Sequence, residues 1–444
     1  MPAKVGRPKN LKKRALEDVS IRSGTANAAD GASAKKFKAT KVTHRSHGKA
    51  EGVVLACGEG DVGQLGLGPD VMERMRAGFV RIPDPIIQIC AGGMHTVCLT
   101  NKGQLYTFGC NDEGALGRDT SEEGTETEPA LVEGLEKIIQ VTAGDSHTAA
   151  LSEDGRVFAF GNFRDANGSM GLTKKGIQKT PIEVLPDAVV VKIASGSDHI
   201  CCLTENSELF TLGCAEQGQL GRVAECFSTR GGRLGLDTIL NASMVRCRKY
   251  KTRRLAKFSD VWTGQYMTFA QEKDTGDIYS WGLNNYYQLG FGDIENRFIP
   301  ERVQSFAGRQ WQILSGGQHH TVAMDSEGKV YTLGRADYGR LGLGEDIKTE
   351  VTEPTLVAAL QSETCVDIAA GGCVSFALTN TGKIYAWGMG TSKQLGIGTE
   401  DDAWTPTQVS GKQFETRRGV MVDSGGQHTV FLAKDVEPVN GNGH

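Results

Sequence analysis

Short runs of alternating apolar and polar residues recur along most of the chain. One group consists of "KIIQVTAG" at 137–144, "HTAALS" at 147–152, "RVFAFG" at 156–161 and "TPIEV" at 180–184. Alternation over five or six residues is typical of a half-buried β-strand, and the "EDG" at 153–155 is a turn signal. This group therefore predicts four short strands.

The group repeats along the chain, and two markers give its period. A glycine that ends an apolar strand and opens a G-x7-G loop, the glycine loop, occurs at 58, 109, 161, 213, 282, 334 and 388. A small-Gly-x-x-His-Thr sequence or a degenerate form of it, the marker loop, begins at 91, 143, 195, 263, 315, 370 and 424. Four strands repeated seven times at about 52 residues predict an all-β fold, a seven-bladed β-propeller.

The two ends of this repeat array complement each other. No apolar strand follows "SGGQHTVFLAKD" at 424–435, although one follows each earlier copy, and "GVVLACG" at 52–58 has the form of a third strand without a first or second before it. We expect the N-terminal strand to complete the last blade and close the ring, because closure removes two exposed sheet edges. The expected propeller spans 51–436, between a tail at 1–50 and a short C-terminal tail at 437–444.

Charge divides the chain into a basic tail and an acidic body. Residues 1–50 hold 13 Lys and Arg against 3 Asp and Glu, a net charge of +10, which leaves −14 for the rest because the whole chain carries −4. A segment so charged and so poor in apolar residues is predicted to be disordered. "KNLKKR" and "KKFKATK" resemble nuclear-localisation clusters, which also bind phosphate. The candidate DNA-contacting residues of the tail are Arg7, Lys9, Lys12, Lys13, Arg14, Lys35, Lys36 and Lys38.

Cysteine usage and hydropathy favour a reduced, intracellular protein. The 11 cysteines include no C-x-x-C pair, and no apolar run approaches the ~20 residues of a membrane span. We expect no membrane partner, no cofactor and no metal site, since the histidines of the marker loops lack short-range ligand pairs.

Three departures from the repeat are candidates for function. The glycine loop "GNFRDANGSMG" at 161–171 is two residues longer than the others, which is either a harmless insertion or a hairpin that contacts a partner. Asp145 and Asp198 bring acids to two neighbouring marker loops. With the marker histidines they would form an acidic, imidazole-rich patch suited to a basic partner, unless each imidazole is purely structural.

The third departure is a long insert at 222–255, between the fourth and fifth glycine loops. It contains "TRGGR" at 229–233 and "RCRKYKTRR" at 246–254. A solvated charge run and a contact with an anionic partner such as nucleic acid are both open interpretations of these basic residues.

Several of these strings together resemble the regulator of chromosome condensation family, over residues 52–434. They include "GDVGQLGLG" at 60–68, "GGMHTVCL" at 92–99, "FGCNDEGALGRDTS" at 108–121, "AGDSHTAAL" at 143–151 and "SGGQHHTV" at 315–322. The resemblance implies a propeller that acts in the nucleus as a guanine-nucleotide exchange factor for the small GTPase Ran while bound to chromatin. Such a protein needs no covalent chemistry and is not an enzyme in that sense.

The resemblance also implies roles for single residues. The long loop matches the family's β-wedge, here Phe163, Arg164, Asp165, Ala166, Asn167, Gly168, Ser169 and Met170. Positions associated with the exchange step match Asp145, Asp198 and His319, with His320 an alternative to His319. Positions associated with Ran binding match Asp61, His95, Arg222 and His428. Arg230 and Arg233 match the loop that meets the histone acidic patch on the nucleosome.

The expected partners are therefore Ran, the histone acidic patch with nucleosomal DNA, and a nuclear import receptor that binds the basic tail. A non-catalytic chromatin adaptor is the main alternative function. A propeller hydrolase is a weaker one, because no nucleophile with its base, and no pair of carboxylates, stands out at the expected axis.

Overall fold

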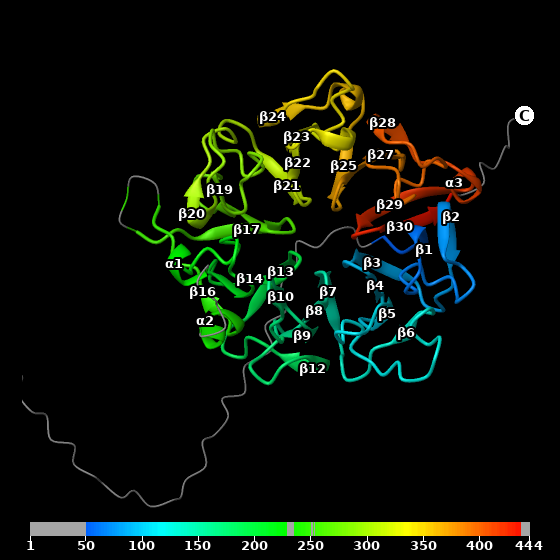
Figure 1. Cartoon of the computed structure of the whole chain (residues 1–444), viewed down its shortest axis with the longest axis horizontal. Helices are drawn as coiled ribbons and strands as arrows, with labels where there is room; N and C mark the ends of the chain where they lie inside the picture. The colour runs from blue at the N-terminus through cyan, green and yellow to red at the C-terminus, as the bar shows by residue number, and fades with distance from the viewer. Residues whose placement is uncertain (1–49, 229–234, 250–251, 253, 437–444) are drawn as a thin grey trace, which may run out of the picture. The chain divides into compact units, whose positions relative to one another are not determined.

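Seven four-stranded antiparallel sheets surround a common axis in the computed structural model, which describes residues 50–228, 235–249, 252 and 254–436 (Figure 1). This arrangement confirms the predicted seven-bladed β-propeller. Among the described helices, none has the length and apolar character needed to cross a membrane.

The blades are numbered in chain order, and their strands run from the axis outward. Blade 1 contains β3 (Ile86–Ala91), β4 (His95–Thr100), β5 (Leu105–Gly109) and β6 (Ala130–Leu131). Blade 2 contains β7 (Ile138–Ala143), β8 (His147–Ser152), β9 (Val157–Gly161) and β12 (Gln178–Glu183). Blade 3 contains β13 (Val190–Ser195), β14 (His199–Thr204), β15 (Leu209–Gly213) and β16 (Ser243–Met244). Blades 4 and 5 contain β17 (Phe258–Thr263), β18 (Met267–Glu272), β19 (Ile278–Gly282) and β20 (Arg297–Arg302); and β21 (Trp311–Gly316), β22 (His320–Asp325), β23 (Val330–Gly334) and β24 (Val351–Leu356). Blades 6 and 7 contain β25 (Cys365–Ala370), β26 (Val374–Thr379), β27 (Ile384–Gly388) and β28 (Ala403–Gln408); and β29 (Arg417–Ser424), β30 (His428–Asp435), β1 (Val53–Glu59) and β2 (Glu73–Val80).

The remaining elements are short and lie in the connections. They are the hairpin strands β10 (Arg164–Asp165) and β11 (Gly168–Ser169), the helices α1 (Glu225–Ser228), α2 (Leu236–Leu240) and α3 (Lys412–Glu415), and the 3-10 turns η2 (Asp337–Gly339) and η3 (Ala358–Leu360). The helices α1 and α2 belong to the long insert that follows blade 3's third strand.

The second strand of each repeat forms the interior of its blade. Every residue of β4, β8, β14, β22 and β26 is buried, because these strands are paired on both edges and covered on both faces by neighbouring blades. Apolar side chains that face outward from one sheet pack on the next, so the hydrophobic core is spread over the blade boundaries.

Blade 7 is built from both ends of the propeller, as the sequence predicts. β1 pairs with β30 in an unbroken antiparallel register from Val53 opposite Ala433 to Gly58 opposite His428, and β2 adds the outer strand. Figure 1 shows blue β1 and β2 beside red β29 and β30. The N-terminal segment thus supplies two strands, and β1 covers the edge of β30 that would otherwise be open.

The glycine that opens each glycine loop is required by close backbone contact. Gly58 has a φ of 110°, and a Cβ added there would lie 2.7 Å from the Cα of His428. Positive φ is costly for a side chain, and overlap with backbone cannot be relieved by rotamer changes. The equivalent glycines at 109, 161, 213, 282, 334 and 388 have φ between 103° and 119°.

Marker histidines connect neighbouring blades. The Nε2 of His95 lies 2.9 Å from the Thr148 hydroxyl on blade 2, and that hydroxyl donates to the backbone carbonyl of Ala115 at 2.8 Å. Because the hydroxyl proton is committed to the carbonyl, the hydroxyl accepts from an imidazole that carries its proton on Nε2. We call this arrangement the histidine lock.

The same lock recurs around the ring. It joins His199 to Thr268 and the Gln219 carbonyl, His320 to Ser375 and the Arg340 carbonyl, and His428 to Thr96 and the Gln64 carbonyl. Burial lowers the pKa of His95 to about 4 and that of His428 to about 3, so both imidazoles are neutral. The glycine three residues earlier leaves room for the ring, since a Cβ on Gly92 would lie 2.6 Å from Nδ1 of His95.

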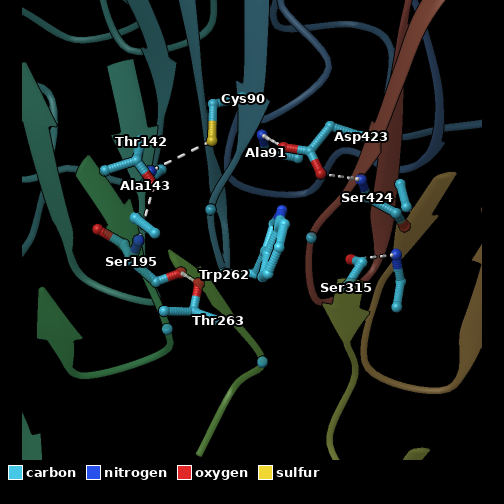
Figure 2. Close-up of a pocket in the computed structure, with 18 of the residues that line it drawn as sticks. Cys90, Ala91, Thr142, Ala143, Ser195, Trp262, Thr263, Ser315, Asp423 and Ser424 are labelled. Carbon is cyan, nitrogen blue, oxygen red and sulfur yellow. Dashed lines mark hydrogen bonds between the residues drawn. The ribbon is translucent and has the colours of Figure 1, made fainter. Parts of the chain in front are cut away.

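A second set of interblade bonds lines the central channel, which encloses about 200 Å³ (Figure 2). Side chains of one inner strand accept from a backbone amide of the next: Cys90 from Ala143, Thr142 from Ser195, Ser315 from Ala370, and Asp423 from Ala91. Loss of water in this narrow channel raises the pKa of Asp423 to about 6.

The requirement for glycine at the start of a glycine loop can be tested in blade 7, where the two ends of the propeller meet. We expect Gly58→Ala to lower the free energy of unfolding by more than about 2 kcal/mol, because it adds backbone overlap to the cost of positive φ. Gly68→Ala is the matched control, since Gly68 has a φ of 89° with no atom within 4 Å of an added Cβ. Its expected cost is about 1 kcal/mol. Equal melting temperatures for the two variants would contradict the close-contact explanation.

Asp423 predicts a pH dependence of stability. An aspartate in an unfolded chain has a pKa near ~3.9, so between about pH 4 and pH 6 the folded protein holds a proton that the unfolded chain releases. Stability therefore falls as pH rises through this range. Asp423→Asn removes that loss, and we expect its melting temperature to rise relative to wild type from about pH 4 to about pH 6 and to stay level above that. The exposed Asp70→Asn is the control, and a difference that stays constant with pH would show the assignment to be wrong.

Candidate functional site

Glycine loops and marker loops lie at the same end of every blade. The amide of Cys110, just after the loop glycine, donates to the carbonyl of Met94, just before the marker histidine, at 2.8 Å. The other blades repeat this bond between Asn162 and Ser146, Cys214 and Asp198, Leu283 and Tyr266, Arg335 and His319, Met389 and Cys373, and Glu59 and Gln427. We call this end of the ring the marker face.

The long glycine loop forms a hairpin on the marker face. Arg164 pairs with Ser169 and Asp165 with Gly168, so the turn consists of residues 166–167. Phe163 and Met170, at the two ends of the predicted wedge, are buried in the core between blades 2 and 3. The part available to a partner is therefore residues 164–169, while the two apolar residues anchor the hairpin.

Carboxylates lie directly beside this wedge. Asp198 is only 8% exposed, and its Oδ1 accepts a hydrogen bond from the backbone amide of Arg164 at 2.7 Å. Burial, together with the nearby charge of Asp145, raises the pKa of Asp198 to about 7. Asp145 is exposed on the neighbouring marker loop. The structure thus brings the predicted exchange residues Asp145, Asp198 and Arg164 together.

His319, and not His320, is the histidine directed to the marker face. His320 begins β22 and forms a histidine lock, whereas His319 occupies the position that Asp198 has in blade 3. The half-buried ring of His319 packs edge-on against Tyr286, with 4.8 Å between centroids. Burial and the charges of Arg340 and Arg335 lower the pKa of His319 to about 4, so it is neutral at physiological pH.

Asp61 is exposed on the glycine loop of blade 7. Its Oδ1 accepts from Nε2 of Gln64 at 3.0 Å, which fixes the carboxylate at the mouth of a groove of about 730 Å³. The groove is also lined by Asp112, Asp119, Glu123 and Glu126. With five carboxylates against Arg118 and Lys179, the lining carries a net negative charge, as expected for contact with a basic surface.

Three predicted binding residues have internal partners. His95 and His428 are 1% and 0% exposed and form histidine locks, so for these two the structural alternative to an imidazole-rich patch holds. Arg222 donates to the carbonyls of Thr211, Thr238 and Asn241 and so fastens the α2 segment to blade 3. Burial lowers the pKa of Arg222 to about 10. All three residues hold the scaffold together.

The predicted chromatin contacts fall largely outside the described residues. Arg230, Arg233 and every candidate of the basic tail lie there. Within the insert, the basic string at 246–254 includes Lys249, whose ammonium pairs with Glu272 at 2.8 Å and with Asp274. Part of the insert's positive charge is therefore neutralised within the propeller.

Sequence reasoning missed several polar residues around the wedge. Glu113 and Glu216 lie on the glycine loops of the two flanking blades, and Asn162 is buried at the base of the hairpin. Tyr266 occupies the same position before the marker strand as Asp198 and His319, and burial raises its pKa to about 12. Aligning the repeats at that position would have revealed Tyr266 from the sequence.

Comparison with known proteins agrees with this geometry. The description "RCC1-like domain" matches residues 53–431. The chain is 54% identical to the human "Regulator of chromosome condensation" over 90% of this chain and 95% of that one. It is 30% identical to the Saccharomyces cerevisiae "Guanine nucleotide exchange factor SRM1" over 85% and 86%.

A solved structure shares the fold as well as the sequence. Prp20p from Saccharomyces cerevisiae, described with its binding properties to Gsp1p and histones, superposes with a TM-score of 0.78 and 30% identity. The match covers 87% of this chain and 92% of Prp20p. The repeat, the closed ring and these likenesses together show that this chain belongs to the RCC1-like domain family.

Proposed function

We propose that this protein is a guanine-nucleotide exchange factor for the small GTPase Ran and works while bound to chromatin in the nucleus. The observation that carries the proposal is the wedge, a hairpin that extends from the marker face between acidic side chains. The relatives support the same function, because one is named a guanine nucleotide exchange factor and another a regulator of chromosome condensation.

Exchange requires a protein that binds the nucleotide-free GTPase more tightly than the loaded one. Small GTPases of this kind hold nucleotide at about picomolar affinity, which corresponds to roughly −16 kcal/mol. Coupling between two ligands of one protein is reciprocal. The factor by which the exchange factor weakens nucleotide binding to the GTPase therefore equals the factor by which nucleotide weakens binding of the exchange factor. The propeller therefore needs a rigid surface that fits the empty site, and no covalent step.

The marker face offers two means of lowering nucleotide affinity. The wedge places Arg164 and the turn at 166–167 where they press on the nucleotide site of Ran. The carboxylates of Asp145 and Asp198 attract the basic groups that otherwise hold phosphate, and they oppose the phosphate's own charge. Asp61 and the acidic groove beside it guide the basic surface of Ran onto this face.

Chromatin binding is assigned to basic residues away from the wedge. We place the contact with the histone acidic patch at Arg230 and Arg233, and contacts with nucleosomal DNA in the tail at 1–50. Phosphate contacts by lysine and arginine release counterions, so this binding weakens steeply with salt. The tail clusters also fit a nuclear import receptor, which recognises basic segments of this kind.

Shortening the wedge tests the exchange function. Deleting Ala166 and Asn167 reduces the loop to the length of its sisters while keeping the anchors Phe163 and Met170. We expect GDP release from Ran, measured by stopped-flow with a fluorescent nucleotide, to slow by about 100-fold, or ~2.7 kcal/mol. Nucleosome binding stays near wild type. A wild-type protein that does not accelerate release would favour the adaptor function instead.

Two arginines of blade 2 provide a matched pair for the same assay. Arg164 and Arg156 are both exposed and each pairs with one carboxylate, but they lie at opposite ends of the blade. We expect Arg164→Ala to slow release by about 10-fold and Arg156→Ala to have no effect. Equal rates for the two variants would remove Arg164 from the mechanism.

The chromatin contacts should be separable from exchange. We expect removal of residues 1–49 combined with Arg230→Ala and Arg233→Ala to weaken nucleosome binding and to flatten its dependence on salt. The rate of GDP release from free Ran stays within about twofold of wild type, because the marker face is intact. Proportional loss of both activities in a folded protein would argue for one shared surface.

A further inference from the structure

The boundary beneath the wedge is the one where a marker histidine lacks its lock. Ile200 stands where Thr148 and Thr268 provide the hydroxyl at other boundaries, so His147 meets only the Ser195 hydroxyl of blade 3, at 3.1 Å. The ring of Phe163 packs against His147 instead, with 4.8 Å between centroids. A hydroxyl that would hold the glycine loop down onto the ring is therefore absent from this boundary as the structure describes it.

Carboxylates from both flanking blades hold the long loop instead. On one side Glu113, from the glycine loop of blade 1, accepts from Arg164 Nη1 at 2.6 Å through Oε1 and from Asn162 Nδ2 at 2.8 Å through Oε2. Asn162 is fully buried, and its Oδ1 accepts from the amide of Gly171 at 2.7 Å and the hydroxyl of Ser169 at 3.1 Å. Glu113 thus contacts one hairpin strand directly and the other through Asn162.

On the other side Glu216, from the glycine loop of blade 3, reaches the turn of the hairpin. Its Oε2 accepts from the amide of Ala166 at 2.9 Å, while Asp198 of the same blade accepts from the amide of Arg164. The wedge is therefore bonded at its tip and at both strands by groups from two different blades. A two-stranded hairpin of this length has little stability of its own in water.

The sequence shows that Glu113 is unusual for its position. Four residues after the loop glycine, the regular loops have Val62, Gln217, Tyr286, Tyr338 and Ser392, and only the loop that faces the wedge has an acid. The position of Glu216, three residues after the glycine, is Asp61, Asp112 and Asp337 in other loops. The longer glutamate side chain is what reaches the hairpin turn.

We propose that Glu113 and Glu216 are positioning residues for nucleotide exchange, which hold the wedge in one orientation from its two sides. This inference rests on the proposed exchange function. An ion pair at the surface, such as Glu113 with Arg164, contributes little to the free energy of folding. We therefore infer that this pair serves to orient the hairpin. A displacement of about 1 Å in a working group can cost roughly 100-fold in rate, which makes such a constraint effective.

The test compares alanine and glutamine variants of each glutamate in Ran nucleotide release. We expect Glu216→Ala to lower the maximal rate by about 10-fold with a smaller change in the concentration of Ran at half-maximal rate. Glu216→Gln recovers most of that rate, because its amide oxygen still accepts from Ala166. Glu113→Ala has a similar effect, which becomes smaller when Arg164→Ala is already present, while the part due to Asn162 remains. Glu205→Ala, an exposed glutamate at the opposite end of blade 3, is the control.

Amide hydrogen exchange of residues 164–169 in the free protein provides a readout that does not involve Ran. We expect faster exchange in Glu113→Ala and Glu216→Ala, and wild-type protection in Glu216→Gln and Glu205→Ala. Alanine variants that match Glu205→Ala in both measurements would overturn the positioning role. The wild-type protein could fail to accelerate nucleotide release from Ran while the alanine variants still show faster hydrogen exchange. That result would contradict the exchange function but support the restraint of the hairpin.

Discussion

The ring depends on a hydrogen bond that crosses the blade boundary from a buried, neutral imidazole to a hydroxyl. Four boundaries contain it in the same form, from His95, His199, His320 and His428. Each hydroxyl donates a hydrogen bond to a glycine-loop carbonyl, so the pair of bonds joins the second strand of one blade, the loop of that blade and the next blade. Leaving any member unpaired in this interior would cost about 1–3 kcal/mol.

The same bond distinguishes the boundary beneath the proposed wedge from the four boundaries that contain the lock. Where Ile200 replaces the hydroxyl residue, no hydroxyl of the next blade bonds to a carbonyl of the glycine loop, and this loop is the longer one. This boundary has no histidine lock but has a projecting hairpin. Carboxylates of Glu113 on one side, and of Glu216 and Asp198 on the other, hold the hairpin in place of the lock. Asp198 illustrates the cost, because burial holds its pKa near about 7 and a charged form there is unfavourable for folding.

The fold could be predicted from the sequence because period and strand alternation are local signals that repeat seven times. The closure followed from the strand missing after Asp435, and the wedge from a difference in loop length. The roles of the histidines could not be inferred, because His319 and His320 are adjacent in sequence and only the start of β22 decides which one is buried. Glu113 and Glu216 were missed for a related reason. Their function arises between blades, where residues about 50 positions apart meet, and single-repeat patterns contain no information about that contact.

Closure by the N-terminal strands also sets the point in synthesis at which the ring can be completed. Gly58 and His428 are neighbours in the sheet although 370 residues separate them in the chain. During synthesis β1 leaves the ribosome early and can pair with β2, but its other edge stays open until β30 is complete. Bringing such distant segments together is slow and exposes strand edges to other chains. A chain released before β30 is complete therefore keeps an open edge on β1. Chaperones would have to protect the first strand made rather than the last.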